Sequence, residues 1–205
     1  MESLESPALH AAVLAAGPST RFGSPKPLLR LGGTPIVHQA AARAAAVAGH
    51  SVTIVLGANA REIAPALRQS AATVLVNREW EEGLASSIRA AVRSTPPRCD
   101  GLLLTLCDQV AITPDDLRRL YVAWRRHPIL VVAALYGGAP GLPAIFPRWA
   151  FSDLLELRGD RDPRLLLRRS ADRLVRVPMS NAAVDLDTPE DLLLVETGAA
   201  GPPAN

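Results

Sequence analysis

The stretch VLAAGPSTRFGSPKPLL, residues 13–29, joins the end of an apolar run to a loop that contains glycine, proline and two cations. The apolar run, residues 9–16, has almost no polar side chains, which is typical of a strand buried on both faces of a sheet. Gly17 allows a tight turn whose amides can point at an anion, and Arg21 and Lys26 follow at intervals that suit a row of phosphates. The stretch therefore predicts a strand and a polyphosphate-binding loop, with a solvated strand-to-helix connection as the alternative.

Strand-like apolar runs alternate with amphipathic stretches along the rest of the chain. The strands are expected at residues 9–16, 51–56, 73–76, 101–107 and 129–135, with a last short strand that ends at Asp187. The helices are expected at residues 35–49, 60–69, 83–93 and from 113, then around 151–157 and 164–170 and from 188. The glycines and prolines of residues 137–143 are expected to interrupt the pattern. This order predicts an α/β fold with a mainly parallel sheet and helices on both faces, in which ligands bind beyond the carboxyl ends of the strands.

The composition favours a single intracellular domain. The 205 residues are 48% hydrophobic with a net charge of +2, which supplies a large core but no strongly basic surface for nucleic acid. Cys99 and Cys107 form no metal-binding or redox motif, and no apolar stretch is long enough to cross a membrane. The N-terminus carries two glutamates where a signal peptide requires positive charge. We expect a cytoplasmic protein without nucleic-acid or membrane partners, with one domain at residues 1–197 and a disordered tail at residues 198–205.

Two common phosphate motifs are absent from the first loop. Gly17 and Gly23 are separated by five residues, whereas the Walker A pattern has four and continues with lysine and then serine or threonine. The dinucleotide pattern G-x-G-x-x-G is also missing. The residues alone thus predict a phosphate site without specifying the nucleotide.

Two aspartates follow predicted strands and are candidate metal ligands. Asp108 comes directly after the apolar run at residues 101–107, and Thr113 rather than Asp108 is suited to cap the next helix. Mg²⁺ prefers carboxylate oxygen and usually takes one or two protein carboxylates together with substrate phosphates. We therefore expect Asp108 to bind Mg²⁺, with Asp187 as a second ligand. The alternatives are a turn aspartate at position 108 and an ordinary helix start after position 187.

A further candidate element begins at Gly83, where a predicted helix starts with small and hydroxyl-bearing residues up to Ser87. The amides and hydroxyls of such a helix start can bond the edge of a nucleobase or a phosphate. Helix capping alone explains one serine, so a purely structural role is the alternative.

The chain resembles the MobA-like nucleotidyltransferases in several segments that occur in the same order. The first loop matches their signature in Leu14, Ala15, Ala16, Gly17, Arg21, Gly23, Pro25 and Lys26. Residues 77–88 are similar to an Asn-x-x-Trp-x-x-Gly-x-x-Ser-Ser segment, and residues 185–192 to Asp-x-Asp-Thr-Pro-Glu-Asp-Leu. Residues 106–110 are similar to Leu-Cys-Asp-Gln-Pro, with Val110 in place of the proline. The Leu-Ala-Ala-Gly form resembles the molybdenum cofactor cytidylyltransferase branch, whereas the guanylyltransferase branch has Leu-Ala-Gly-Gly.

The resemblance implies a single-domain Rossmann-like nucleotidyltransferase fold and a Mg²⁺-dependent transfer of CMP from CTP to a phosphate acceptor. The acceptor that it implies is molybdopterin, and the partner that would receive the product is a molybdenum hydroxylase. The expected catalytic groups are Arg21, Lys26 and Asp108. The implied binding roles are the nucleotide loop for Leu14, Ala15, Ala16 and Gly17, the phosphates for Arg21 and Lys26, the base for Gly83 and Ser87, and the metal for Asp108 and Asp187.

One segment departs from the family pattern and leaves the acceptor open. Residues 158–164 resemble a Gly-Asp-x-Gly-Ala-Arg element but carry Asp162 and Pro163 where that element has glycine and alanine. The alternatives are therefore a guanylyltransferase acting on the same pterin and a cytidylyltransferase for methylerythritol phosphate or a sugar phosphate. A non-catalytic chaperone that carries the molybdenum cofactor is the alternative from another class.

Overall fold

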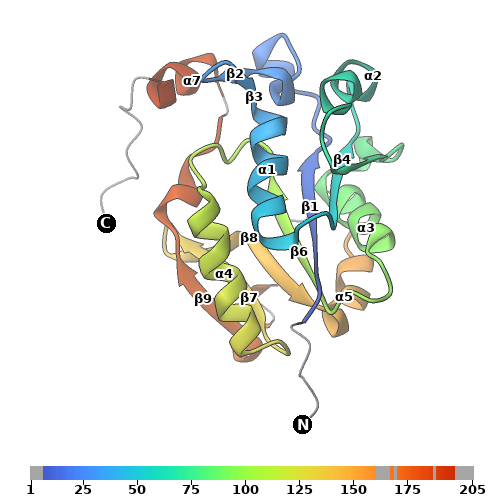
Figure 1. Ribbon diagram of the computed structural model, residues 1–205, viewed down its shortest axis with the longest axis vertical. Helices are drawn as coiled ribbons and strands as arrows, with labels where there is room; N and C mark the ends of the chain where they lie inside the picture. Colours follow the sequence, from blue (N-terminus) through green and yellow to red (C-terminus); the bar gives the residue numbers. More distant parts are fainter. Residues whose placement is uncertain (1–6, 160–166, 169, 187, 197–205) are drawn as a thin grey trace.

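A seven-stranded sheet runs through the middle of the computed structural model, which describes residues 7–159, 167–168, 170–186 and 188–196 (Figure 1). The strand order is β5-β4-β1-β6-β8-β7-β9. The strands are β1 (Leu9–Ala15), β4 (Val52–Leu56), β5 (Thr73–Val76), β6 (Gly101–Leu106), β7 (Val131–Tyr136), β8 (Ala139–Pro147) and β9 (Leu174–Pro178). β8 is antiparallel to both of its neighbours, and the other pairings of this sheet are parallel. The predicted α/β class with a mainly parallel sheet is confirmed.

Helices cover both faces of this sheet. The helices with at least one α-helical turn are α1 (Ile36–Ala48), α2 (Ala60–Ile63), α3 (Leu84–Ser94), α4 (Pro114–Arg126), α5 (Phe151–Leu155) and α7 (Pro189–Glu196). α1 and α4 lie in front of the sheet in Figure 1, and α3 and α5 pack on the opposite face. A short hairpin of β2 (Arg30–Leu31) and β3 (Thr34–Pro35) precedes α1. Its Gly32 and Gly33 have φ of 57° and 79°, which is the backbone that a tight hairpin turn requires.

β1 shows why its sequence lacks polar alternation. Ala11, Val13 and Ala15 contribute to the apolar cluster under α1 and α4, whereas Ala12 and Leu14 contribute to the cluster under α3 and α5. Both faces of the strand are therefore buried, and its carboxyl end delivers the following loop to the rim of the sheet.

The expectation that residues 137–143 interrupt the strand pattern is wrong. The two glycines at positions 137 and 138 turn the chain with φ of 55° and 75°, and β8 then runs back beside β7. The pairing of β7 with β8 shifts register between Ala133 and Ala134, so residues 142 and 143 oppose no β7 residue. Proline is tolerated at such a bulge because no amide hydrogen is needed there.

Two other expectations need correction. The last strand, β9, ends at Pro178 rather than at Asp187, because the chain that follows bonds to a loop instead of a strand: Leu186 donates its N–H to the Asp108 carbonyl at 3.2 Å. The helix expected at residues 60–69 consists of α2 and a 3₁₀ segment, Ala64–Leu67, in which Pro65 lacks the amide that would continue an α-helix. Asp187, residues 160–166 and the tail at residues 198–205 lie outside the described residues.

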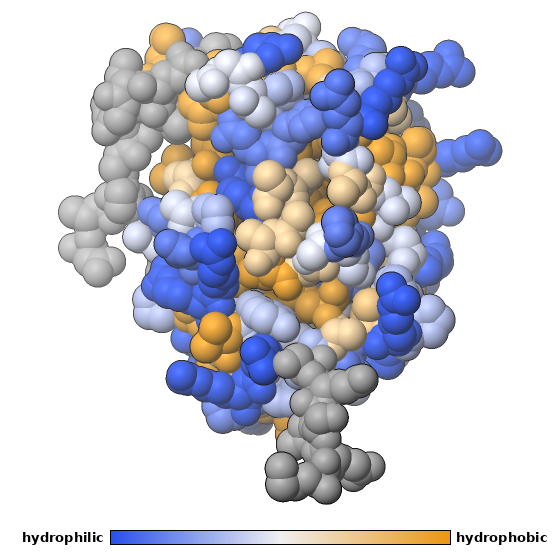
Figure 2. Space-filling model, viewed as in Figure 1, coloured by the Kyte–Doolittle hydropathy of each residue, from blue (hydrophilic) through white to orange (hydrophobic). Residues whose placement is uncertain are grey.

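The face seen in Figure 2 has hydrophilic side chains around its margins and a less polar area near its centre, where the alanine-rich α1 lies in Figure 1. No helix in the described ranges is both long enough and apolar enough to cross a membrane.

Candidate active site

A pocket of about 360 Å³ lies beyond the carboxyl ends of β1 and β6. The two strands leave the sheet side by side, since Cys107 donates its N–H to the Leu14 carbonyl at 3.0 Å. The pocket is lined by Leu14, Ala15, Ala16, Gly17, Pro18, Ser19, Thr20, Lys26, Pro27, Ile36, Trp80, Gly83, Leu84, Ser87, Leu106, Cys107 and Asp108. The fold thus brings eight of the predicted site residues to one cavity, namely Leu14, Ala15, Ala16, Gly17, Lys26, Gly83, Ser87 and Asp108.

The loop after β1 is closed by a bond between its two ends. Ser19 has a φ of 54°, and its Oγ accepts the Lys26 N–H at 2.9 Å. Between them lies the 3₁₀ turn Thr20–Phe22. The backbone of Arg21 belongs to this turn, and the Arg21 side chain lies outside the described part of the structure. The loop therefore returns the chain to the pocket at Lys26.

A cation and a carboxylate meet inside the pocket. Lys26 Nζ is 3.3 Å from Asp108 Oδ2, although the two residues are 82 positions apart. Their side chains are 15% and 31% exposed, so both retain access to solvent. Lys26 Nζ also lies 5.5 Å from the centroid of the Phe22 ring. A partly exposed ion pair adds little to stability, and its importance here is that both charge types face one cavity.

Several bonds hold the turn that carries Asp108. The Asp108 carbonyl accepts the N–H of Val110 at 2.9 Å and that of Leu186 at 3.2 Å. The buried Gln109 side chain donates to two carbonyls on other segments, and Arg43 of α1 donates to the Val110 carbonyl at 3.0 Å. These contacts fix the turn even though valine occupies the position at which related sequences have proline.

The donor set suits a divalent cation that is shared with nucleotide phosphates. Asp108 offers a carboxylate to the cavity, and Mg²⁺ commonly combines one or two such groups with phosphate oxygens. No group of three or more His, Cys, Asp and Glu side chains that could bind a metal occurs in the described ranges. Leu186, the sequence neighbour of Asp187, is bonded to the Asp108 backbone. A metal bound partly by substrate fits these residues better than a site built from protein ligands alone.

The wall opposite the first loop is the start of α3. Gly83 begins this helix with φ of 104° and ψ of −170°, a conformation that glycine adopts readily. The buried Asn77 donates from Nδ2 to Ser86 Oγ at 2.8 Å and to Ser87 Oγ at 3.1 Å. Ser86 Oγ in turn donates to the Gly83 carbonyl at 2.8 Å. Ser87 accepts in its only described hydrogen bond, so its hydroxyl hydrogen can be donated into the pocket.

Sequence reasoning missed two contributors to this wall. Trp80 lines the pocket. It packs so closely on Gly57 that a Cβ added at position 57 would lie 2.5 Å from the Trp80 Cβ. Asn77 is buried and makes the bonds that orient Ser86 and Ser87. Both belong to the segment quoted above for its family resemblance, but only the folded chain reveals what they contact.

The Cys107 thiol, although it lies beside Asp108, is not a candidate nucleophile. It is buried, and its burial, together with the neighbouring Asp108 carboxylate, raises the pKa of the thiol far above its ordinary value. The thiol therefore stays protonated and is a poor nucleophile.

A pocket beyond the carboxyl ends of the strands is where proteins with open α/β sheets bind ligands, and here a cation and a carboxylate face it. Residues 11–175 match the MobA-like NTP transferase domain, and the chain belongs to this nucleotidyltransferase family. The family resemblance and the fold expected from it are thereby confirmed.

Two curated proteins illustrate how far the similarity extends. Nicotine blue oxidoreductase from Paenarthrobacter nicotinovorans is 32% identical over 126 residues, which is 61% of this chain and 61% of that protein. Molybdenum cofactor cytidylyltransferase from Escherichia coli K12 is 24% identical over 125 residues, which is 61% of this chain and 62% of that protein. The chain thus spans about three fifths of the length of these relatives.

The solved structures agree over nearly the whole chain. Rv0371c from Mycobacterium tuberculosis H37Rv superposes with a TM-score of 0.79 at 27% identity, covering 94% of this chain and 99% of that one. The complex of Rv0371c with manganese has a TM-score of 0.74 at 26% identity, with coverage of 93% and 98%.

Proposed function

We propose that this protein transfers CMP from CTP to the terminal phosphate of molybdopterin and releases pyrophosphate. The observation that carries the proposal is the pair formed by Lys26 and Asp108, 3.3 Å apart in a pocket between the first loop and the start of α3. A triphosphate with a bound metal ion offers negative oxygens to Lys26 and a positive ion to Asp108, so its charges complement this pair. The pocket residues follow the Leu-Ala-Ala-Gly form, and a cytidylyltransferase is among the relatives.

The chain's own groups perform positioning and charge stabilisation. The first loop and Lys26 bind the triphosphate, and Arg21 is the second cation of this loop. An oxygen of the acceptor phosphate attacks the α-phosphorus, the bond from that phosphorus to the bridging oxygen breaks, and pyrophosphate departs with the electron pair. Such a reaction depends on alignment and on stabilising negative charge rather than on a side-chain nucleophile.

Asp108 is the proposed ligand of Mg²⁺, with Asp187 as the second. The bond from Leu186 to the Asp108 backbone supports this pairing, because Asp187 is the next residue in the sequence. When bound, Mg²⁺ neutralises phosphate charge and orients the phosphates.

Gly83 and Ser87 are the proposed base contacts. The Ser87 hydroxyl accepts from Asn77 and retains its hydrogen for an acceptor. Cytosine presents two acceptors, the ring nitrogen N3 and the carbonyl oxygen O2, so a donor in this position suits the base.

The test is a panel of nucleotides and acceptors with the purified protein and Mg²⁺. We expect pyrophosphate release from CTP with molybdopterin, and much less with GTP, ATP or UTP, or with methylerythritol phosphate or a sugar phosphate. Release with another pair would change the substrate assignment. Binding without release from any pair would overturn the proposed transfer in favour of a cofactor carrier.

The relative named nicotine blue oxidoreductase supplies a second outcome to measure. The same preparation is incubated with nicotine blue and a reduced nicotinamide, the common biological hydride donor. Nicotinamide oxidation in the absence of any pyrophosphate release would replace the transferase proposal with an oxidoreductase.

A further inference from the structure

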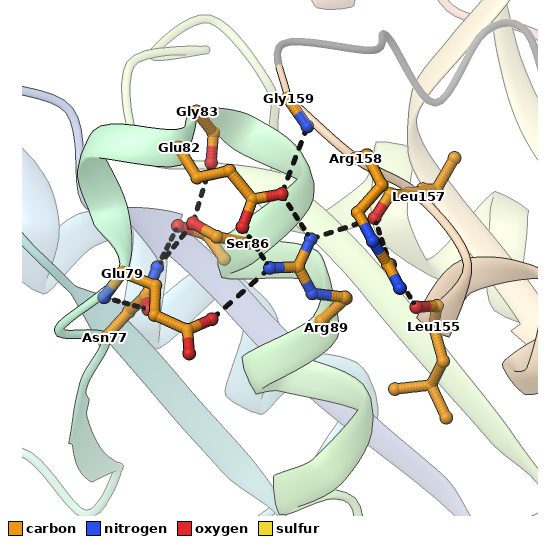
Figure 3. A network of polar contacts seen from close by, with 11 residues as sticks. Asn77, Glu79, Glu82, Gly83, Ser86, Arg89, Leu155, Leu157, Arg158 and Gly159 are labelled. Atoms are coloured by element: carbon orange, nitrogen blue, oxygen red, sulfur yellow. Dashed lines mark hydrogen bonds and ion pairs between the residues drawn. The ribbon is translucent and has the colours of Figure 1, made fainter.

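Arg89 of α3 is a nearly buried cation that binds two other pieces of the chain, the turn at residues 79–82 and the segment beyond α5 (Figure 3). Its side chain is only 6% exposed. Its guanidinium donates to Glu82 Oε1 at 2.8 Å and to Glu82 Oε2 at 2.5 Å, and also to Glu79 Oε2 at 3.3 Å. Another N–H donates to the Leu157 carbonyl at 2.8 Å. The planar fork of an arginine fits such a two-point contact with a carboxylate, whereas a lysine ammonium cannot reproduce it.

Glu82 also connects Arg89 to the segment after α5. Its Oε1 also accepts the Gly159 N–H at 3.2 Å, and the Gly159 carbonyl accepts the Ala85 N–H at 3.2 Å. The hydrogen bond from Arg89 lowers the pKa of the Glu82 carboxyl to about 2, with the Gly159 amide as the next contribution. The pair is therefore ionised throughout the neutral range.

These bonds enclose the turn from Trp80 to Gly83, which is also the wall of the pocket. Trp80 and Gly83 line the cavity, and Gly83 donates its N–H to the Trp80 carbonyl at 3.0 Å. Asn77, the residue after β5, supports the same wall through its hydrogen bonds to the Ser86 and Ser87 hydroxyls. Arg89 braces it from the opposite side, through Glu82, as Figure 3 shows.

We propose that Arg89 is a positioning residue that sets nucleobase selectivity: by joining Glu82 to Leu157 it fixes the turn at Gly83 against which the base is read. The proposal rests on the proposed function, because it assumes that this wall contacts the base. Arg89 itself does not line the pocket. It therefore acts on base selectivity indirectly, by fixing the positions of Gly83 and Ser87.

The test compares Glu82→Gln and Arg89→Lys with the matched control Glu79→Gln. Glu82→Gln keeps an oxygen for Gly159 but loses the charge and one acceptor of the fork, and Arg89→Lys keeps the charge but loses the fork. Glu79 undergoes the same charge change, yet it is 64% exposed and makes a single contact of 3.3 Å to Arg89. The dissociation constants of CTP and GTP are measured for each variant.

The expected result is a fall of about tenfold in the preference for CTP over GTP in Glu82→Gln and Arg89→Lys, arising from weaker CTP binding, as loss of a forked contact predicts. Glu79→Gln is expected to keep the wild-type preference. A merely structural role would weaken both nucleotides equally or lower only the melting temperature, and that outcome would overturn the proposal.

A second readout does not require catalysis. Amide hydrogen exchange at Ala85 and Gly159 is expected to accelerate in Glu82→Gln and not in Glu79→Gln; unchanged exchange in both would also overturn the proposal. Should the wild-type protein bind CTP selectively but release no pyrophosphate, the proposed transfer fails while the positioning role of Arg89 stands. Should pyrophosphate be released with unchanged base preference in the variants, the positioning role alone fails. A wild-type protein that binds neither nucleotide would overturn both.

Discussion

At the scale of single residues, substitution of Asp108 tests whether the protein is an enzyme or a non-catalytic carrier of the cofactor. Asp108→Asn keeps the size of the side chain but removes the charge that faces Lys26 in the pocket. We expect Mg²⁺-dependent pyrophosphate release to fall by about 100-fold or more. Without the Asp108 carboxylate, Mg²⁺ would no longer be held where it neutralises the charge of the phosphates. Asp115→Asn, at an exposed position on α4, is the control and should retain activity. Equal turnover in wild type and Asp108→Asn would contradict a catalytic role for this carboxylate.

Gly17 tests whether the first loop approaches phosphate closely. A Cβ added at Gly17 meets no heavy atom within 4 Å, so Gly17→Ala should leave the free energy of unfolding unchanged or raise it by up to about 1 kcal/mol. Gly17 also lines the pocket, so an added methyl group would stand beside the amides of the loop that is proposed to bind phosphate. We expect the dissociation constant of CTP to rise about tenfold by calorimetry, since a close backbone contact with phosphate is blocked. Unchanged CTP affinity would place the phosphates elsewhere.

Substitution of Gly57, unlike that of Gly17, should lower the free energy of unfolding. A Cβ at this position would lie 2.5 Å from Trp80 Cβ and 2.7 Å from the Ala16 carbonyl oxygen, so the backbone or the indole has to move. We expect Gly57→Ala to lose about 1–3 kcal/mol of unfolding free energy, as overpacking typically does. Because Trp80 and Ala16 both line the pocket, CTP affinity should fall as well. Urea unfolding and calorimetry measure the two effects, and wild-type values for both would refute the steric argument.

At the scale of elements, the start of α4 is joined to the chain that leads to Asp187. Thr113 Oγ1 accepts the Asp116 N–H at 3.1 Å, and Asp116 Oδ2 accepts the Thr113 N–H at 2.9 Å, which is a capping box. Asp116 Oδ2 also accepts from Asn181 Nδ2 at 2.8 Å. One carboxylate therefore caps a helix and anchors the 3₁₀ turn Ser180–Ala183.

Asp116→Asn should lower stability in a way that depends on pH. Burial alone raises the pKa of Asp116, but the hydrogen bonds from Asn181, Thr113 and Arg119 outweigh burial and lower it. A lowered folded-state pKa stabilises the protein above the unfolded value of about 3.9, and this contribution is lost as pH falls through the folded value. Near pH 7 we expect the variant to lose about 1–3 kcal/mol of unfolding free energy, which is typical of losing a buried hydrogen bond to a charged group. Below about pH 4 the difference between variant and wild type should be smaller. Urea unfolding across this range measures it, and a difference independent of pH would contradict the assignment.

The elements also show where sequence reasoning succeeds and fails. The start of α4 was predictable because capping depends on neighbours within one turn, Thr113 and Asp116. β8 was not predictable, because it contains three prolines, and one of them, Pro143, is accommodated where the register with β7 shifts. That shift depends on the pairing of two strands and leaves no local pattern in residues 137–143.

At the scale of the whole molecule, the sheet explains why the pocket could be foreseen and its supports could not. Parallel strands deliver their following loops to one edge, so the loops after β1 and β6, which carry Lys26 and Asp108, were expected at the same edge of the sheet. Arg89 lies on α3, and its partners lie on the turn before that helix and beyond α5. Periodicity and motifs do not encode such tertiary contacts, and Arg89 alone reads as an ordinary helical cation.

The same architecture predicts how ligand binding changes global stability. A ligand that binds only the folded chain at 100 times its dissociation constant adds about 2.7 kcal/mol. For a chain of 205 residues this corresponds to a rise in melting temperature of about 5–11 °C. CTP with Mg²⁺ should produce this rise, and removal of Mg²⁺ with EDTA should reduce it, because the triphosphate then meets Asp108 without a cation between them. In Asp108→Asn, EDTA should make little difference, whereas Asp115→Asn should respond like the wild type. A shift that is equally large with EDTA in the wild-type protein would mean that the pocket binds CTP without the metal, and Asp108 would then need another role.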